Sequence, residues 1–232
     1  MQLTVLGKYG PYGKAGEGAA SGYLVTDRDF RFLCDMGSGV LSRLINVIDV
    51  RQLDGIFISH LHYDHTSDLL PFRYLLEELE HPVKIFTHKE DSAWYRILFS
   101  HPLFEIVDID ENTEFEIRGV KLTFYKMKHA IDNYAILFDG TAKLLYTGDT
   151  QYNEKLVEAA KRADLVLADC SKPDVFIGAH MKATEGLKLQ EETGAEILAT
   201  HLAPDFSPEN LFAGNDKISV AEEGKTYTVR HK

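Results

Sequence analysis

The segment Ile56-Phe-Ile-Ser-His60-Leu-His62-Tyr-Asp64-His65 decides how this chain is interpreted, because its last six residues form the pattern H-x-H-x-D-H. An apolar run precedes the pattern and predicts a short β-strand. Residues i and i+2 of an extended segment point to the same side, so His60 and His62 are placed to bind one metal ion. Asp64 and His65 follow after the chain turns, and they are placed to face a second ion. Imidazole and carboxylate ligands together suit zinc or manganese.

Further His and Asp residues occur in one recurring context, a β-rich run that ends in His or Asp. The five runs are Gly55–His60, Leu122–His129, Leu144–Asp149, Leu165–Asp169 and Ile197–His201. Strand ends at one edge of a sheet let their loops meet in a single cleft, so we expect these side chains to converge. Four other histidines lack this context and are predicted to be solvated surface residues: His81, His88, His101 and His231.

Asp149 admits two interpretations. It lies in Thr147-Gly148-Asp149, where glycine leaves room for close approach of the backbone to a site. One carboxylate can bridge two cations and offset their repulsion. Alternatively, Asp149 caps a helix that begins near Asn153. The nearby H-x-H-x-D-H pattern favours the bridging role.

The rest of the pattern predicts a single domain, residues 1–232, that mixes α and β structure. Strands are expected at 3–6, 22–26, 30–35, 83–86, 134–138 and 143–146, with two more meeting at Gly119 within 115–128. Helices are expected at 39–47, 69–79, 154–161 and 184–192, and from a cap at Asp91 through Leu98. The glycine-rich run from Gly7 to Gly22 matches no phosphate-binding motif. It is either a flexible loop or a backbone that approaches a ligand.

Composition limits the classes of protein. The 232 residues are 44% hydrophobic and 26% charged, typical of a globular chain. The net charge of −11 disfavours long nucleic acid as a partner. Neither a membrane-spanning run nor a signal-peptide pattern is present, which predicts a cytoplasmic protein without membrane contact. The two cysteines, Cys34 and Cys170, are predicted to be buried, reduced and without a catalytic role.

These residues resemble the metallo-β-lactamase superfamily, and within it the branch of the ribonuclease Z-type phosphodiesterases. The resemblance is carried by Asp35 in Cys34-Asp-Met-Gly-Ser-Gly39, H-x-H-x-D-H at 60–65, His129, Thr147-Gly-Asp149, the segment 178–184 and Thr200-His201. It implies an α/β fold, a four-layer αββα sandwich. It also implies one zinc or manganese ion on His60, His62 and His129, a second on Asp64, His65 and His201, Asp149 as the bridge, and His180 facing the substrate phosphate.

Two features depart from the ribonuclease members. Asp149 follows His129 by only 20 positions, which leaves no room for the arm that grips transfer RNA in those enzymes. Asp169 stands where they have a glutamate paired with the histidine that corresponds to His180. Asp169 therefore either supports His180 or satisfies backbone donors at a strand end.

The predicted function is hydrolysis of a small phosphodiester by a hydroxide that two metal ions activate. Asp64 would orient the hydroxide, and His180 would contact a phosphate oxygen or protonate the leaving oxygen. The alternatives are transfer RNA 3′ processing, then lactone or thioester hydrolysis; a binding protein with a dormant site ranks last. Substrate choice is expected in the loops 7–18 and 172–178. The sequence leaves open whether the chain forms a homodimer.

Overall fold

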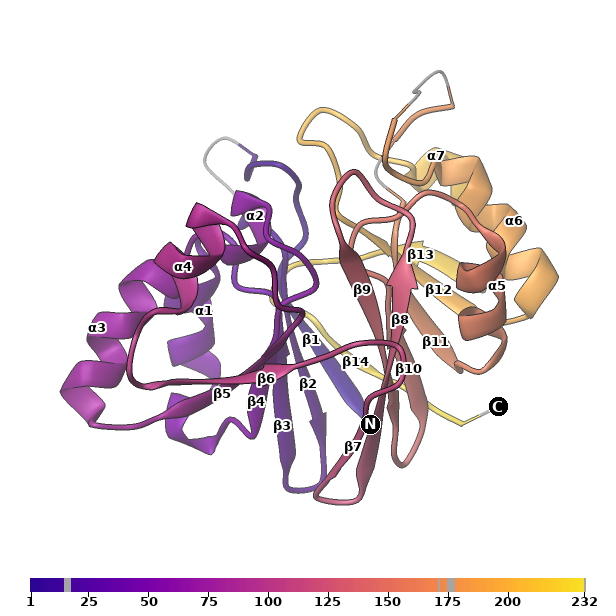
Figure 1. Ribbon diagram of the computed structural model, residues 1–232. Helices are drawn as coiled ribbons and strands as arrows, with labels where there is room; N and C mark the ends of the chain where they lie inside the picture. The colour runs from indigo at the N-terminus through magenta and orange to yellow at the C-terminus, as the bar shows by residue number, and fades with distance from the viewer. Residues whose placement is uncertain (15–17, 171, 175–177, 232) are drawn as a thin grey trace.

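Two β-sheets face each other, and helices cover their outer surfaces (Figure 1). The computed structural model describes residues 1–14, 18–170, 172–174 and 178–231. Within them, each sheet has seven strands. The first sheet has the order β14 (Thr226–Thr228), β1 (Gln2–Gly7), β2 (Gly22–Asp27), β3 (Phe30–Cys34), β4 (Gly55–Phe57), β5 (Val83–Thr87) and β6 (Phe104–Asp108). The second has the order β13 (Ile218–Val220), β12 (Glu196–Thr200), β11 (Leu165–Asp169), β10 (Lys143–Tyr146), β9 (Asn133–Asp139), β8 (Val120–Met127) and β7 (Glu114–Ile117).

The helices complete four layers, which confirms the predicted αββα sandwich. Those on the first sheet's outer side are α1 (Val40–Val47), α3 (Leu69–Leu79) and α4 (Ala93–Phe99); α5 (Glu154–Lys161) and α6 (Ala183–Thr193) cover the second sheet (Figure 1). The shorter helical turns are η1 (Val50–Gln52), α2 (Tyr63–Thr66) and α7 (Glu209–Phe212). Among the described residues, none of the helices has the length and apolar character that a membrane span requires.

The central core is aromatic because residues of one parity along each inner strand meet between the two sheets. Phe30 and Phe32 of the first sheet contact Phe138 of the second, with ring centroids 6.0 and 5.7 Å apart. Residues of the other parity pack under the helices in two further apolar clusters. Side chains on both faces of each sheet are therefore buried. This packing fixes where the strand ends lie.

Parallel pairing brings the functional strand ends to one edge of the sandwich. The strands β3, β4 and β5 pair in parallel, as do β10, β11 and β12. The strand β8 runs the same way as β10, because both are antiparallel to β9. The carboxyl ends of β4, β8, β10, β11 and β12 therefore share an edge, as the five runs predict.

Several sequence predictions need correction. The helix α4 is capped by Ser92, whose Oγ accepts a hydrogen bond from the Tyr95 N–H at 3.0 Å; Asp91 is not the cap.

His88 is buried, contrary to prediction, because it follows β5 at the crowded edge and its ring packs on that of Tyr134. His231 is exposed, and His81 and His101 are partly exposed. Both cysteines are buried and unpaired, as expected.

The glycine-rich run is closely packed at its two ends, whereas Pro11, Tyr12 and Lys14 between them are exposed, and residues 15–17 lie outside the described part. A Cβ on Gly7 would lie 1.8 Å from the Ala20 carbonyl oxygen, and one on Gly22 would lie 2.3 Å from Val40 Cγ2. A Cβ on Gly10 would lie 2.0 Å from Nε2 of His201. These glycines are needed because neighbouring atoms occupy the space of a side chain. The run approaches one of the predicted ligands directly.

Candidate metal centre

The H-x-H-x-D-H segment supplies four of the gathered side chains. His60 and His62 follow β4, and His62 is the N-terminal cap residue of α2, with extended backbone at φ −65° and ψ 150°. The helical turn of α2 then carries Asp64 and His65. The start of the helical turn after His62 divides the segment as predicted, into a pair before the turn and a pair on it.

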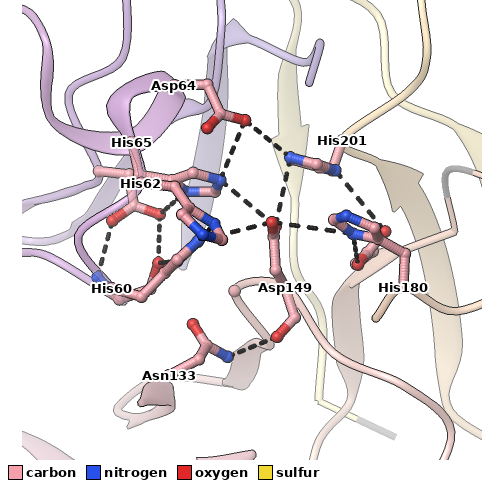
Figure 2. Close-up of polar contacts among 12 residues, drawn as sticks. His60, His62, Asp64, His65, Asn133, Asp149, His180 and His201 are labelled. Atoms are coloured by element: carbon pink, nitrogen blue, oxygen red, sulfur yellow. Dashed lines mark hydrogen bonds and ion pairs between the residues drawn. The ribbon is translucent and has the colours of Figure 1, made fainter. Parts of the chain in front are cut away.

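The second sheet supplies the other side chains. His129 follows β8, Asp149 follows β10 and His201 follows β12. Figure 2 shows Asp149 between the histidines of the first segment and the pair His180 and His201. The centre therefore lies where the edges of the two sheets meet.

Among the described residues, three groups of potential ligand atoms share Asp149, and one of them consists of Asp149, Asp169, His180 and His201. The other two match the predicted sets. The first group contains His60, His62, His129 and Asp149; the second contains Asp64, His65, Asp149 and His201. Within each group the ligand atoms lie within 4.8 Å of one another. The structure thus brings together the seven residues that were predicted as metal ligands, in the two sets expected. Asp149 does not cap α5, because Asn153 accepts the hydrogen bond from the Leu156 N–H at 3.0 Å.

The two carboxylate oxygens of Asp149 face different groups. Its Oδ1 lies 3.3 Å from Nε2 of His65 and 3.3 Å from Nε2 of His201. Its Oδ2 lies 3.5 Å from Nε2 of His60 and 3.8 Å from Nε2 of His129. This division is the one that a carboxylate bridging two cations requires.

Buried polar atoms test whether the residues suit metal ions. Among the described residues, Nε2 of His65 and Oδ1 of Asp149 are both buried and make no hydrogen bond. Buried polar atoms are normally satisfied, so atoms left without a partner in one place indicate a missing one. The donor set of imidazole nitrogens and carboxylate oxygens suits zinc, with manganese as the alternative. The residues fit a pair of cations.

Burial and charge control protonation at the centre. Burial lowers the pKa of His60, His62 and His129, which favours the neutral imidazole that binds metal. Burial alone would lower the pKa of His65 too, but the carboxylates, Asp149 foremost, outweigh it and raise that pKa. The pKa of Asp149 is held well below its usual range by the surrounding histidines, despite its burial. The carboxylates therefore need positive charge beside them, from imidazolium groups or bound cations.

The carboxylate of Asp35 orients the ring of His65, which belongs to the second group. The sequence did not assign this role. The Asp35 carboxylate is fully buried and accepts hydrogen bonds from the Ser59 N–H at 2.8 Å and the Ser59 hydroxyl at 2.7 Å. It also lies 2.7 Å from Nδ1 of His65 and accepts from the Tyr146 hydroxyl at 2.5 Å. Engaging Nδ1 leaves Nε2 of His65 turned toward the ligand group.

Asn133 was missed altogether by the sequence analysis. Its side-chain amide donates to the carbonyl oxygens of Thr147 at 3.1 Å and Asp149 at 2.7 Å, and so fixes the backbone that carries the bridge (Figure 2). The only signal in the sequence is a polar residue at the start of the otherwise apolar strand β9. Polar residues at strand starts are too common for that signal to identify it.

His180 lies beside the two groups and is tied to Asp169. Its Nδ1 is 2.9 Å from Oδ2 of Asp169, and its ring stacks on that of His201 with centroids 5.0 Å apart. The same Asp169 oxygen accepts from the Thr150 N–H at 3.1 Å. Asp169 therefore does both things that the sequence left open, contacting His180 and satisfying a backbone donor.

A cavity of about 430 Å³ opens over the centre and is lined by Pro11, His62, Tyr63, Asp64, Lys172, His180 and His201. Each of the two loops expected to govern substrate choice contributes one of its described residues, Pro11 or Lys172. Residues 15–17 and 175–177 of those loops lie outside the described part of the chain. A larger cavity of about 620 Å³, between β1 and α1, contains none of the predicted ligands.

Residues 1–227 match the family described as anti-Pycsar protein Apyc1. The probable metallo-hydrolase YhfI of Bacillus subtilis (strain 168) is 30% identical over 240 residues, which cover 97% of this chain and 98% of YhfI. The crystal structure of YhfI, a metallo-β-lactamase fold protein, is similar with a TM-score of 0.89 and 27% identity, over 97% of this chain and 98% of that one. The fold is therefore the metallo-β-lactamase fold, as the resemblance implied.

Two more distant structures share the fold. The short form of human tRNase Z has a TM-score of 0.78 and 18% identity, and 99% of each chain is covered. A diphosphatase from the PhnP family has a TM-score of 0.81 and 17% identity, covering 97% of this chain and 96% of that one.

Proposed function

The chain belongs to the family of the anti-Pycsar protein Apyc1, within the metallo-β-lactamase superfamily, and on this basis we propose that it is a metallo-hydrolase that cleaves a small phosphodiester. The arrangement around Asp149 carries this proposal. One carboxylate oxygen faces each of two ligand groups, beneath a cavity of about 430 Å³. A cavity of that volume suits a small molecule rather than a polymer.

His60, His62 and His129 would hold one ion, and Asp64, His65 and His201 the other, with Asp149 shared. Zinc is proposed, with manganese as the alternative. When bound, the two ions activate water for attack on phosphorus and offset the negative charge that develops on the phosphate oxygens.

The chain's own residues supply the proton chemistry. Asp64, whose Oδ2 lies 3.0 Å from Nε2 of His201, borders the cavity and would orient the attacking water by accepting a hydrogen bond from it. Asp169 engages Nδ1 of His180, which leaves Nε2 as the atom that reaches substrate. Nε2 of His180 would donate a proton to the leaving oxygen.

Size and charge favour a small substrate over transfer RNA. The segment between His129 and Asp149 contains β9, β10 and a short hairpin, so it holds no long arm. The net charge of −11 opposes binding of a polyanion. The likeness to human tRNase Z, at 18% identity, supports the fold alone.

Turnover by the zinc-loaded or manganese-loaded protein tests the proposal. The panel contains bis(4-nitrophenyl) phosphate, cyclic nucleotides, cyclic sugar phosphates, dinucleotides and precursor transfer RNA, with a lactone and a thioester as controls. We expect hydrolysis of a small phosphodiester that is abolished in Asp149→Asn and retained in His231→Ala, a histidine exposed elsewhere on the surface. Preferential cleavage of precursor transfer RNA, of the lactone or of the thioester would overturn the proposal.

A further inference from the structure

Tyr63 lies between two predicted ligands in the sequence, and it is more exposed than either of them. It is the first residue of α2, and its neighbours His62 and Asp64 belong to the two ligand groups. The side chain of Tyr63 is in neither group. Tyr63 is 68% exposed, which is unusual for an aromatic residue beside a buried centre.

Trp94 supports the Tyr63 ring. The two rings are perpendicular, at 89°, with centroids 4.8 Å apart, which is a favourable edge-to-face geometry. Trp94 is the second residue of α4, a separate helix that packs on the first sheet. Tyr63 is thus a large apolar ring held by a neighbour from another element. Because Trp94 already holds the Tyr63 ring in place, a ligand that binds to this ring loses little conformational entropy in ordering it.

The cavity over the centre has two kinds of lining. His62, Asp64, His180 and His201 form the polar part next to the ligand groups. Tyr63 and Pro11 add apolar surface, and Lys172 adds a positive charge. A phosphate held at the polar part would place its ester substituent against the remaining lining.

We propose that Tyr63, backed by Trp94, is a stacking surface for a flat aromatic ring on the substituent that stays on phosphorus when the leaving group departs. This inference rests on the proposed phosphodiesterase function and narrows its substrate class to phosphodiesters that carry such a ring. Aromatic stacking contributes beyond the burial of apolar area, so a saturated ring of equal size binds less well. Tyr63 acts here as a specificity-determining residue and takes no part in the chemical step.

Two esters with the same leaving group separate stacking from chemistry. Phenyl 4-nitrophenyl phosphate and cyclohexyl 4-nitrophenyl phosphate differ in the flatness of the retained ring and little in its size. We expect Tyr63→Leu to raise KM for the phenyl ester about 3- to 10-fold, with kcat and both constants for the cyclohexyl ester changed less than twofold. Tyr63→Phe should behave like the wild type. Tyr74→Leu is the matched control, because Tyr74 is 73% exposed on α3 and outside this cavity.

A binding measurement decides the inference independently of turnover. Calorimetric titration of the zinc-loaded protein with phenylphosphonate and cyclohexylphosphonate should give tighter binding of the phenyl compound, and Tyr63→Leu should remove that preference. Trp94 is the only tryptophan of the chain, so its fluorescence should change with the phenyl compound. Equal affinity for the two phosphonates, no binding of either, or an equal loss on both in Tyr63→Leu would overturn the inference. If neither ester is hydrolysed but the phenyl preference is present, the proposed activity fails and the role of Tyr63 stands.

Discussion

Nδ1 of His65 lies 2.7 Å from Oδ2 of Asp35, and both side chains are fully buried. The contact joins the end of β3 to α2 and directs the other ring nitrogen of His65 toward Asp149. Asp35 has a left-handed backbone, with φ 58°, a conformation that costs energy for a residue other than glycine. Contacts with Ser59, His65 and Tyr146 hold the carboxylate in place.

Replacing Asp35 by asparagine should weaken metal binding. The amide retains one acceptor oxygen for the donors that now surround the carboxylate, so His65 loses its fixed orientation. We expect the affinity for the second ion to fall about 10- to 100-fold. Competition with a chromophoric chelator measures this change. Asp27→Asn is the control, because Asp27 is a buried carboxylate that binds Thr141 away from the centre. Similar metal affinities in the two variants would contradict the orienting role.

The purified protein should carry two transition-metal ions per chain, since seven predicted ligands, Asp149 and the six side chains around it, are too many for one tetrahedral ion. His201→Ala should lower the content to about one ion, because His201 belongs to the second group and not to the first. Elemental analysis after dialysis counts the ions. Saturation of the wild type at one ion, unchanged in His201→Ala, would disprove the two-ion arrangement.

Gly10→Ala should disturb the second ion although no predicted ligand is replaced. The new Cβ would lie 2.0 Å from Nε2 of His201, so the imidazole must move. We expect metal content near that of His201→Ala, as measured by elemental analysis. In Gly22→Ala the added Cβ clashes with Val40 instead. That variant should lose thermal stability and keep both ions, and loss of metal from it would remove the argument for a local effect at Gly10.

His180→Ala should retain both ions, because Nδ1 of His180 is engaged by Asp169 and the two ligand groups are complete without it. The rate loss should depend on the leaving group. An alkoxide needs a proton in the transition state and should lose about 10²- to 10⁴-fold, whereas nitrophenolate should lose much less. Steady-state kinetics on an alkyl and a nitrophenyl phosphodiester give the comparison. Equal losses would point to charge stabilisation of the phosphate instead.

His88 should make the fold sensitive to acid. Burial lowers the pKa of His88, although Glu90 and Asp132 oppose the shift. Between the folded pKa and the ordinary value of about 6.5, the unfolded chain binds more protons at this residue. The free energy of unfolding therefore rises with pH across that window. The stability that neutral His88 contributes is lost as the pH falls through it.

Urea unfolding from pH 7 to pH 5 measures this contribution. His88→Gln cannot gain a proton, so its free energy of unfolding should fall less steeply over this range than that of the wild type. If the free energy of unfolding changed equally with pH in His88→Gln and in the wild type, protonation of His88 would not be coupled to unfolding.

The clustering of the candidate ligands could be predicted because their residue types stand at the ends of apolar runs, and strand ends are brought together by sheet pairing. Contacts between segments that are far apart in the sequence could not be predicted. Nothing near Gly10 in the sequence reveals that His201 fills the space beside it, and nothing near His88 reveals the Tyr134 ring that covers it. The cap of α4 was misplaced by one residue because Asp91 and Ser92 are adjacent and both suit that position. The strands β6, β13 and β14 were not predicted, since their short runs carry no strong alternation.

Two cross-sheet hydrogen bonds lie close to the centre, from Tyr146 to Asp35 at 2.5 Å and between Tyr23 and Thr200 at 2.7 Å. They tie the two sheets together where the ligands begin. Pro11, Tyr63 and Lys172 line the cavity above and belong to neither ligand group. Under the proposed function, the residues that would select the substrate are different from those that would hold the metal ions. Substitutions of Pro11, Tyr63 or Lys172 should therefore change which substrate binds and leave every predicted metal ligand in place.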